Sequence, residues 1–271
     1  MLLTRTLSAV VLAPLVLLAI WFGGWWFAAL VVLAAGLMGW EWARLCNGGQ
    51  FGWRGAALVV TLVAAVVVFL LAPDVPALAV LLGGAVVATS LNRDSRPASD
   101  PALRSRRAAT QFFLLIGTAY IGFACLAFLW LRNVPPGGRD LVFWILAVVW
   151  ATDIGAYFAG RGIGGPRLAP RISPNKTWAG LIGGALAAGL VGVVAAGLIG
   201  RDTLLLVAGG IVLAVIAQGG DLLESWCKRR FGVKDSSHII PGHGGILDRV
   251  DGLLAVLPVV FLYLWVMGEA V

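Results

Sequence analysis

The sequence predicts an all-α integral membrane protein, a polytopic bundle of about nine transmembrane helices with its N-terminus in the cytoplasm. Sixty per cent of the 271 residues are hydrophobic, and the mean hydropathy is +0.95. Only 12% of the residues are charged, compared with roughly 25% in soluble domains. A soluble core of this size could not bury so much apolar surface, and apolar runs recur near the length of about 20 residues that a membrane span needs.

The apolar runs follow one another along the whole chain, with polar segments between them. The candidate spans lie near residues 6–22, 24–40, 54–71, 76–92, 109–131, 140–158, 175–198, 202–220 and 253–268. We expect an N-terminal transmembrane region of about five helices, residues 1–140, and a C-terminal transmembrane region, residues 141–271. Two longer polar loops of the second region, 159–174 and 221–252, are expected to face the cytoplasm.

The orientation follows from the basic residues, because cytoplasmic loops carry an excess of Lys and Arg. With the N-terminus inside, seventeen of the 20 basic residues fall on the cytoplasmic side, and only Arg132, Arg139 and Arg201 fall outside. This distribution accounts for the net charge of +7 without nucleic acid as a partner. The three cysteines are widely spaced, which argues against disulfides and against a zinc site.

The stretch "SWCKRRFGVKDSSHIIPGHGGILDRVDG", residues 225–252, is charged and glycine-rich although it lies between two apolar segments. If the helix of 202–220 continues through "GGDLLESWCKRR", then Asp221, Ser225 and Lys228 share one face. Asp248 and Asp251 share a face at the start of the next span. Carboxylates at a membrane boundary are costly unless they are paired or bind metal, and oxygen ligands favour a hard cation such as Mg²⁺.

The "PGHGG" segment lies between these two acidic helix ends. Glycines let backbone N–H groups approach an anion closely, and His243 lies among them. Each piece also has a simpler interpretation: "KRR" as a membrane anchor, a lone His as a structural residue, an Asp as a helix cap. Together, the acids, the basic residues and the glycine loop favour a site for phosphates held with Mg²⁺.

A second polar segment, residues 153–180, carries "SPNKT". Asp153 lies near the inner end of its span. We expect Ser173 to cap the seventh helix and Pro174 to be its first residue. The N-terminus of that helix would then face the cytoplasm as a phosphate site, with Lys176 and Thr177 as additional donors. The simpler alternative is a capped helix with one anchoring lysine.

The residues of 225–251 resemble, over the full length of that stretch, the signature of the phosphatidate cytidylyltransferases, a family also called CDP-diacylglycerol synthases. The signature positions present are Ser225, Lys228, Arg229, Lys234, Asp235, His243, Gly244, Gly245, Asp248, Arg249 and Asp251. The S-P-x-K-T pattern resembles a second segment of the family. The resemblance is strongest over 150–260, and the first half of the chain matches mainly in length and hydropathy.

The resemblance implies that CTP and phosphatidate react to give CDP-diacylglycerol and pyrophosphate, with Mg²⁺ on Asp221 and Asp248. It also implies K⁺ or a similar monovalent second cation, a homodimer, and a multi-pass protein of the cell's inner membrane whose site faces the cytoplasm. The expected catalytic residues are Asp221 and the signature residues other than Gly244 and Gly245. The expected substrate-binding residues are Asp153, Ser173, Asn175, Lys176, Thr177, Gly244 and Gly245.

Two other classes of protein share some of these features. Polyprenol kinases, phytol kinases and CDP-archaeol synthases also combine a lipid, CTP and a metal, but the long signature argues against them. A transporter also has many spans and buried acids. A transporter is expected to place its polar residues near the middle of the membrane, whereas these motifs lie at the cytoplasmic helix ends.

Overall fold

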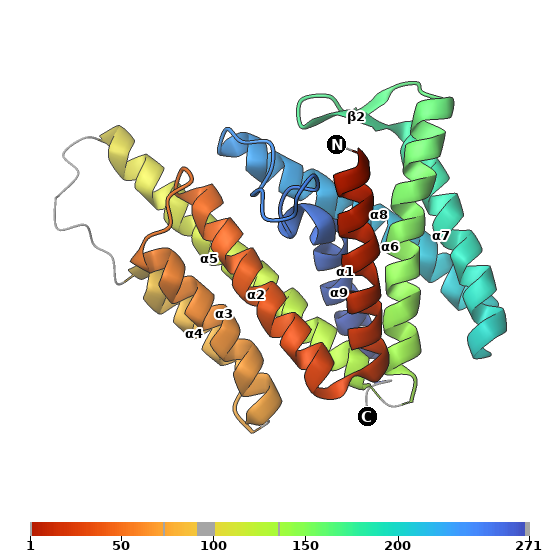
Figure 1. Cartoon of the computed structure of the whole chain (residues 1–271), viewed down its shortest axis with the longest axis horizontal. Coiled ribbons are helices and arrows are strands. Elements are labelled where there is room, and N and C mark those ends of the chain that lie inside the picture. Colours follow the sequence, from red (N-terminus) through yellow and green to blue (C-terminus); the bar gives the residue numbers. More distant parts are fainter. Residues whose placement is uncertain (1, 73, 91–100, 135, 269–271) are drawn as a thin grey trace. The chain divides into compact units, whose positions relative to one another are not determined.

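A computed structural model describes residues 2–72, 74–90, 101–134 and 136–268 of the chain (Figure 1). Within these residues the protein is almost entirely helical, which confirms the all-α prediction. The helices are α1 (Leu2–Phe22), α2 (Gly24–Cys46), α3 (Trp53–Leu71), α4 (Ala77–Ser90), α5 (Pro101–Asn133), α6 (Gly138–Gly162), α7 (Trp178–Ile199), α8 (Thr203–Arg230) and α9 (Leu247–Met267). Two short strands, β1 (Arg167–Ala169) and β2 (Ser173–Thr177), lie between α6 and α7.

Among the described residues, seven helices are long and apolar enough to cross a membrane, so the protein is a multi-pass membrane protein. They are α2, α3, α5 from Arg107 onward, α6, α7, α8 and α9. The described apolar part of α1, Val10–Phe22, and the helix α4 are shorter. These two correspond to the first and fourth predicted spans, so the number of nine spans remains a prediction, as does the cytoplasmic N-terminus.

The described residues form two compact units. The first consists of Met1–Leu129 and Asp235–Leu247, and the second consists of Trp130–Lys234 and Asp248–Val271. The segment 235–247 therefore packs with the first unit although the helices on either side of it, α8 and α9, lie in the second.

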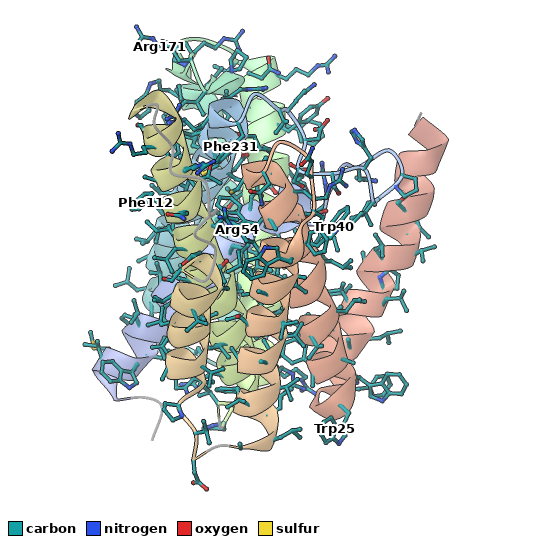
Figure 2. All side chains as sticks on the ribbon, turned by 90° about the vertical axis from the view of Figure 1, so that its left-hand side faces the viewer. Trp25, Trp40, Arg54, Phe112, Arg171 and Phe231 are labelled. Atoms are coloured by element: carbon teal, nitrogen blue, oxygen red, sulfur yellow. The ribbon has the colours of Figure 1, made fainter. Side chains whose placement is uncertain are left out.

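In the first unit, α2 packs against α5 through aromatic contacts. The indole Nε1 of Trp42 donates a hydrogen bond of 2.9 Å to the backbone oxygen of Phe113, and Phe27 and Phe128 meet edge to face with ring centroids 4.8 Å apart. Figure 2 shows Trp40 and Arg54 toward one end of the α2–α3 pair and Trp25 at the other. The contacts of Trp42 thus fix the end of α2 that carries Glu41.

In the second unit, small residues let the helices approach closely, as is typical of membrane proteins. A Cβ on Gly155 of α6 would lie 2.7 Å from the backbone oxygen of Gly183 on α7, and one on Gly220 of α8 would lie 2.7 Å from the backbone oxygen of Asp251 on α9. These contacts hold the acidic turn of α8 against the acidic turn of α9, and they bring α7 close to the half of α6 that contains Asp153.

The prediction that Ser173 caps the seventh helix and that Pro174 begins it is wrong. Residues 173–177 form β2, which pairs antiparallel with β1, and α7 begins at Trp178. The extended backbone of 173–177 is paired with β1, with Ala169 opposite Ser173 and Arg167 opposite Thr177. Gly164 and Gly165 turn the chain with φ of 69° and 93°, which brings the partner strand β1 into place. Figure 1 shows the resulting hairpin at the ends of α6 and α7.

The cap of α7 is Thr177, whose Oγ1 accepts a hydrogen bond of 3.0 Å from the backbone N–H of Gly180. The side chain of Thr177 thus satisfies a backbone donor at the helix start and is buried, 3% exposed. A residue expected to bind substrate therefore has a structural role in this hairpin.

The eighth helix does continue through "GGDLLESWCKRR", the condition on which the shared face of Asp221, Ser225 and Lys228 depended, because α8 spans Thr203–Arg230. Its last turn carries Lys228, Arg229 and Arg230, whose charges favour a helix C-terminus. Since α9 begins at Leu247, the non-helical connection is 231–246, which is shorter than the polar loop 221–252.

Candidate active site

Strand β2 brings Lys176 to the acidic turn of α8. Its Nζ lies 2.5 Å from Oδ2 of Asp221 and 3.4 Å from the backbone oxygen of Gln218. The side chains of Lys176 and Asp221 are 18% and 33% exposed, so this ion pair is reachable from solvent. The "SPNKT" segment thus reaches the acidic turn of α8 from a strand, not from the helix N-terminus that was predicted.

Lys228 joins α8 to α9 through two carboxylates. Its Nζ lies 3.0 Å from Oε2 of Glu224 and 2.6 Å from Oδ1 of Asp248. The three side chains are 11%, 9% and 5% exposed. Because a buried ammonium and buried carboxylates are each costly alone, the three groups stabilise one another.

Of the three residues predicted to share a face of α8, Ser225 donates a hydrogen bond of 3.3 Å from its hydroxyl to Asp221. The third, Lys228, pairs with Glu224 and Asp248 instead. Glu224, which the sequence analysis did not single out, is the direct partner of Lys228 on the same helix. The sequence signal was the spacing of four residues between Glu224 and Lys228, which brings the two side chains together on a helix.

Further acids lie around Asp251. Asp251 is within electrostatic range of Asp221, Glu224 and Asp153. Asp153, on α6, is also within range of Lys176 and Arg249. Like charges in such a group repel one another, and a bound cation would relieve that repulsion.

The donor chemistry of this acid group fits Mg²⁺. Among the residues that the structure describes, no three His, Cys, Asp or Glu side chains form a ready-made metal site. Mg²⁺ usually takes one or two protein carboxylates together with water and substrate phosphates, so a pair of acids is sufficient. The described carboxylates can therefore supply the protein's share of a Mg²⁺ site, although Asp221 and Asp248 are each paired with a lysine here.

The glycine-rich segment 235–247 forms a tight turn in the first unit. The backbone N–H of His243 donates to the oxygen of Ile240, and the backbone N–H of Ile240 donates to the oxygen of Gly244. Each hydrogen bond is 2.9 Å long. Gly242 and Gly244 have φ of 77° and 83°, a conformation that favours glycine. The ring Nδ1 of His243 is buried without a hydrogen-bond partner, so this nitrogen is not fixed by the turn itself.

The segment is held by Glu41, a residue of α2 that the sequence analysis did not consider. Its carboxylate accepts hydrogen bonds from Ser236, Ser237, Ile246 and Leu247. The available signal was a single acid inside an otherwise apolar run, which marks a functional or structural site in a membrane helix.

The remaining predicted residues lie at the surface or serve the local structure. Arg229 is exposed, and its guanidinium donates a hydrogen bond of 3.4 Å to the backbone oxygen of Val233. Asn175 is exposed on β2, and its backbone oxygen accepts from Arg167. Lys234, Asp235 and Arg249 are exposed, and Ser173 is half-buried. Figure 2 marks Arg171, in the turn between the strands.

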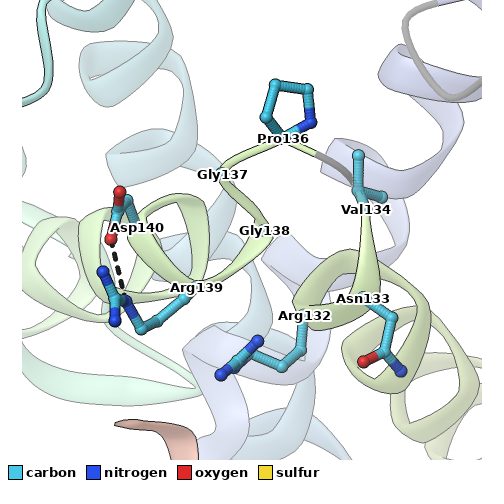
Figure 3. A pocket seen from close by; sticks show the side chains of 8 residues that line it. All are labelled: Arg132, Asn133, Val134, Pro136, Gly137, Gly138, Arg139 and Asp140. Atoms are coloured by element: carbon cyan, nitrogen blue, oxygen red, sulfur yellow. Dashed lines mark hydrogen bonds and ion pairs between the residues drawn. The ribbon is translucent and has the colours of Figure 1, made fainter.

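A cavity of about 450 Å³ lies at the other end of α6 and is separate from the acid group (Figure 3). Residues from the end of α5 to the first turn of α6 line it. In that turn, Nε of Arg139 lies 3.1 Å from Oδ1 of Asp140. Asp140 and Asp153 are separated by about 20 Å along the helix, from the rise of 1.5 Å per residue. Arg132, another of the three basic residues predicted to lie outside, also lines this cavity.

Comparison with known proteins identifies the family. The sequence pattern of the Cytidylyltransferase family matches residues 3–267. A phosphatidate cytidylyltransferase of Brucella suis is 38% identical over 285 residues, covering 98% of this chain and 94% of that protein. The phosphatidate cytidylyltransferase of Pseudomonas aeruginosa is 36% identical over 275 residues, covering 99% and 98%. That of Bacillus subtilis is 44% identical over 155 residues, covering 56% of each chain.

The match extends over both described units, so it includes the first half of the chain, where the sequence analysis had found only similar length and hydropathy. It also includes α8, α9 and the hairpin, which carry the lysines and carboxylates described above. The chain belongs to the Cytidylyltransferase family.

Proposed function

We propose that the protein transfers CMP from CTP to phosphatidate, giving CDP-diacylglycerol and pyrophosphate for phospholipid synthesis. The observation that carries this proposal is the similarity to phosphatidate cytidylyltransferases over nearly the whole of both chains. The lysines and carboxylates at the ends of α8 and α9 supply chemistry that suits it.

The reaction needs positioning and charge neutralisation more than it needs a base, because the phosphate of phosphatidate is already a nucleophile. An oxygen of that phosphate attacks the α-phosphorus of CTP and forms a new P–O bond. The bond from the α-phosphorus to the bridging oxygen breaks, and pyrophosphate leaves with its electrons. The obstacle is repulsion between two polyanions, which fixed cations at the site reduce.

The cations of the site are Lys176, Lys228, Arg229 and Lys234. Lys176 and Lys228 are held in place by Asp221 and Asp248, so their ammonium groups are oriented before substrate arrives. Arg229 and Lys234 are exposed and are available to the β- and γ-phosphates. We assign Ser225, Asp235, His243, Arg249 and Asp251 supporting roles in the same reaction.

The substrate-binding residues belong to the hairpin, to α6 and to the glycine turn. We assign to this role Asp153, Ser173, Asn175, Lys176, Thr177, Gly244 and Gly245. Among them Lys176 reaches the acid group directly, and Thr177 acts through the start of α7.

Mg²⁺ is the proposed cofactor, with Asp221 and Asp248 as its protein ligands. When bound, it would neutralise charge on the triphosphate and favour departure of pyrophosphate. Both carboxylates would then have to exchange a lysine for the ion, which would leave the ammonium groups closer to the phosphates. K⁺ as a second cation, and a homodimer, are further parts of this proposal.

The membrane location suits the two substrates. The acyl chains of phosphatidate can stay in the bilayer while CTP arrives from water at the helix ends. We place the protein in the inner membrane with the site facing the cytoplasm, where the nucleotide is; the excess of basic residues in the predicted cytoplasmic segments supports this orientation.

The reaction is tested with purified protein, phosphatidate, Mg²⁺ and CTP carrying label in either the α- or the γ-phosphate. We expect label from the α-phosphate to enter the lipid and label from the γ-phosphate to leave as pyrophosphate. Entry of the γ-label into lipid would identify a kinase of the polyprenol or phytol type instead. A preference for an archaeal ether lipid over phosphatidate would identify a CDP-archaeol synthase.

The orientation is tested with single cysteines at the exposed positions His238 and Arg201. Cys46, Cys125 and Cys227 are buried, so the background of labelling is low. In intact cells, an impermeant thiol reagent is expected to label Arg201→Cys and to leave His238→Cys unlabelled until the membrane is opened. The reverse pattern would invert the topology and place the site away from CTP.

A further inference from the structure

Glu41 is a fully buried carboxylate, 0% exposed, in the last turns of the apolar helix α2. Its Oε1 accepts from the hydroxyl of Ser237 at 2.6 Å and from the backbone N–H of Ile246 at 2.9 Å. Its Oε2 accepts from the backbone N–H of Leu247 at 2.8 Å and from the hydroxyl of Ser236 at 3.2 Å. Each carboxylate oxygen therefore accepts two hydrogen bonds, and all four donors belong to the segment 235–247.

The donors come from the two ends of that segment. Ser236 and Ser237 lie at its beginning, and Ile246 and Leu247 at its end, so one carboxylate closes the chain into a loop. Hydrogen bonds to a carboxylate are stronger than those between neutral groups. A buried carboxylate without such donors would be very costly, so the segment and Glu41 stabilise each other.

Gly245 is required by this arrangement because of space. A Cβ at this position would lie 2.5 Å from Oε1 of Glu41 and would also collide with the hydroxyl of Ser236. Gly245 does not have positive φ among the described glycines, so its missing side chain matters for the close approach to Glu41. The last glycine of "GHGG", Gly245, thus lets the loop close on α2.

The loop carries residues that the proposed reaction needs. His243 and Gly244 form its turn, and Leu247, which donates to Glu41, directly precedes Asp248 in the chain. Leu247 is also the first residue of α9, so its hydrogen bond to Glu41 holds the start of that helix.

We propose that Glu41 is a positioning residue of this enzyme: its carboxylate holds residues 236–247 closed, and so sets the placement of His243, Gly244 and the start of α9 during CMP transfer. This inference rests on the proposed function. The effect of Glu41 is transmitted through the four hydrogen bonds of the loop.

The test replaces Glu41 with Gln, which keeps the size of the side chain. An amide offers one acceptor oxygen and turns its NH₂ group toward two of the four donors, so the loop cannot stay closed. We expect kcat to fall about 10²-fold in correctly folded protein, because a small misplacement of reacting groups has an effect of that order. The KM for CTP is expected to change less than about threefold, since the loss concerns the transition state.

Hydrogen exchange of the same variant, measured without substrate, reports on the loop itself. We expect faster exchange in peptides covering 236–247 and unchanged exchange in α2 and α3. Asp74→Asn, an exposed acid of the first unit, is the matched control and should change neither quantity. If the wild type made no CDP-lipid but the exchange result held, the proposed function would fail and the anchoring role of Glu41 would stand alone.

A second variant guards against loss of folding in Glu41→Gln. Ser237→Ala removes the shortest of the four hydrogen bonds and should lower kcat about fivefold. The double variant should be no slower than Glu41→Gln alone, because both substitutions remove the same contact between Ser237 and Glu41. Wild-type kcat and wild-type exchange in Glu41→Gln would overturn the proposal. The proposal would also be overturned if the effects of Glu41→Gln and Ser237→Ala on kcat were fully additive. A wild-type kcat per folded molecule of Glu41→Gln would overturn it as well.

Discussion

Within the described residues, two sets of carboxylates differ in the groups that satisfy them. Glu41, in the first unit, accepts from hydroxyl and backbone N–H donors of a single segment. Asp221 and Asp248, in the second unit, are held by the ammonium groups of Lys176 and Lys228. A backbone donor cannot leave its place, whereas a lysine can turn from a carboxylate to a phosphate.

The difference separates a fixed structural contact from an exchangeable site. The Glu41 cluster is closed, with no exposed part of the carboxylate. The pair of Lys176 and Asp221 is reachable from solvent. A substrate phosphate and a divalent cation could take over both partners of that pair without unfolding anything. The experiments below test this distinction, beginning with the largest expected effect.

The largest effect is expected from removing charge at the proposed metal ligands. Asp221→Asn and Asp248→Asn keep the size of the side chain but weaken its bond to a cation. Loss of a contact that stabilises the transition state by about 3–4 kcal/mol lowers the rate about 10²–10³-fold. Turnover is measured on protein shown to be folded in detergent. A near-normal rate in either variant would remove that residue from the proposed metal site.

A smaller effect is expected from the lysine that reaches the site from the hairpin. Lys176→Gln removes the ammonium beside Asp221 and should lower kcat/KM about 10–10²-fold, mainly through a higher KM for CTP. Lys176→Arg keeps the charge, but its planar guanidinium differs in shape from a compact ammonium, so we expect only partial recovery. Full activity of Lys176→Gln would show that the hairpin is not part of the site.

Asp251 is expected to matter less than Asp248, because it supports the site without binding the metal. Asp251→Asn should slow the reaction about tenfold. Asp251 lies within electrostatic range of Asp221, Glu224 and Asp153. It is therefore the alternative to Asp248 as the metal ligand on α9. If Asp251→Asn instead equalled Asp221→Asn in rate loss while Asp248→Asn remained active, the metal ligand on α9 would be Asp251.

The smallest effect concerns stability. Thr177→Ala removes the cap of α7 and should lower the free energy of unfolding by about 1 kcal/mol, seen as a lower melting temperature in detergent. Thr177→Ser keeps the hydroxyl that accepts from Gly180 and should stay close to the wild type. If the alanine variant kept the wild-type melting temperature but lost CTP affinity, Thr177 would contact the substrate directly instead of acting through the start of α7.

The fold class and much of the second carboxylate set could be predicted from sequence, because both depend on local patterns. Hydropathy gave the helices, and helical spacing placed Asp221 and Ser225 on one face, as the hydrogen bond between them confirms. Spacing also explains the pair of Glu224 and Lys228, although the sequence analysis passed over Glu224.

The hairpin and the Glu41 cluster could not be predicted in the same way. A strand of three residues, Arg167–Ala169, is too short to show any periodicity, and it exists because β2 provides its hydrogen-bond partners. Glu41 and the donors in 236–247 are about 200 residues apart in sequence. Only the tertiary structure brings such distant groups together, and a single acid in an apolar run does not reveal its partner.

The distinction between the two carboxylate sets is tested most directly by titrating Mg²⁺ against the activity of two variants, Asp221→Asn and Glu41→Gln. Both are expected to be slow, but for different reasons. The account predicts that half-maximal activity needs about tenfold more Mg²⁺ in Asp221→Asn, and the same Mg²⁺ concentration as the wild type in Glu41→Gln. An equal shift in both variants, or a shift in Glu41→Gln alone, would contradict the separation of a metal-binding carboxylate from a structural one.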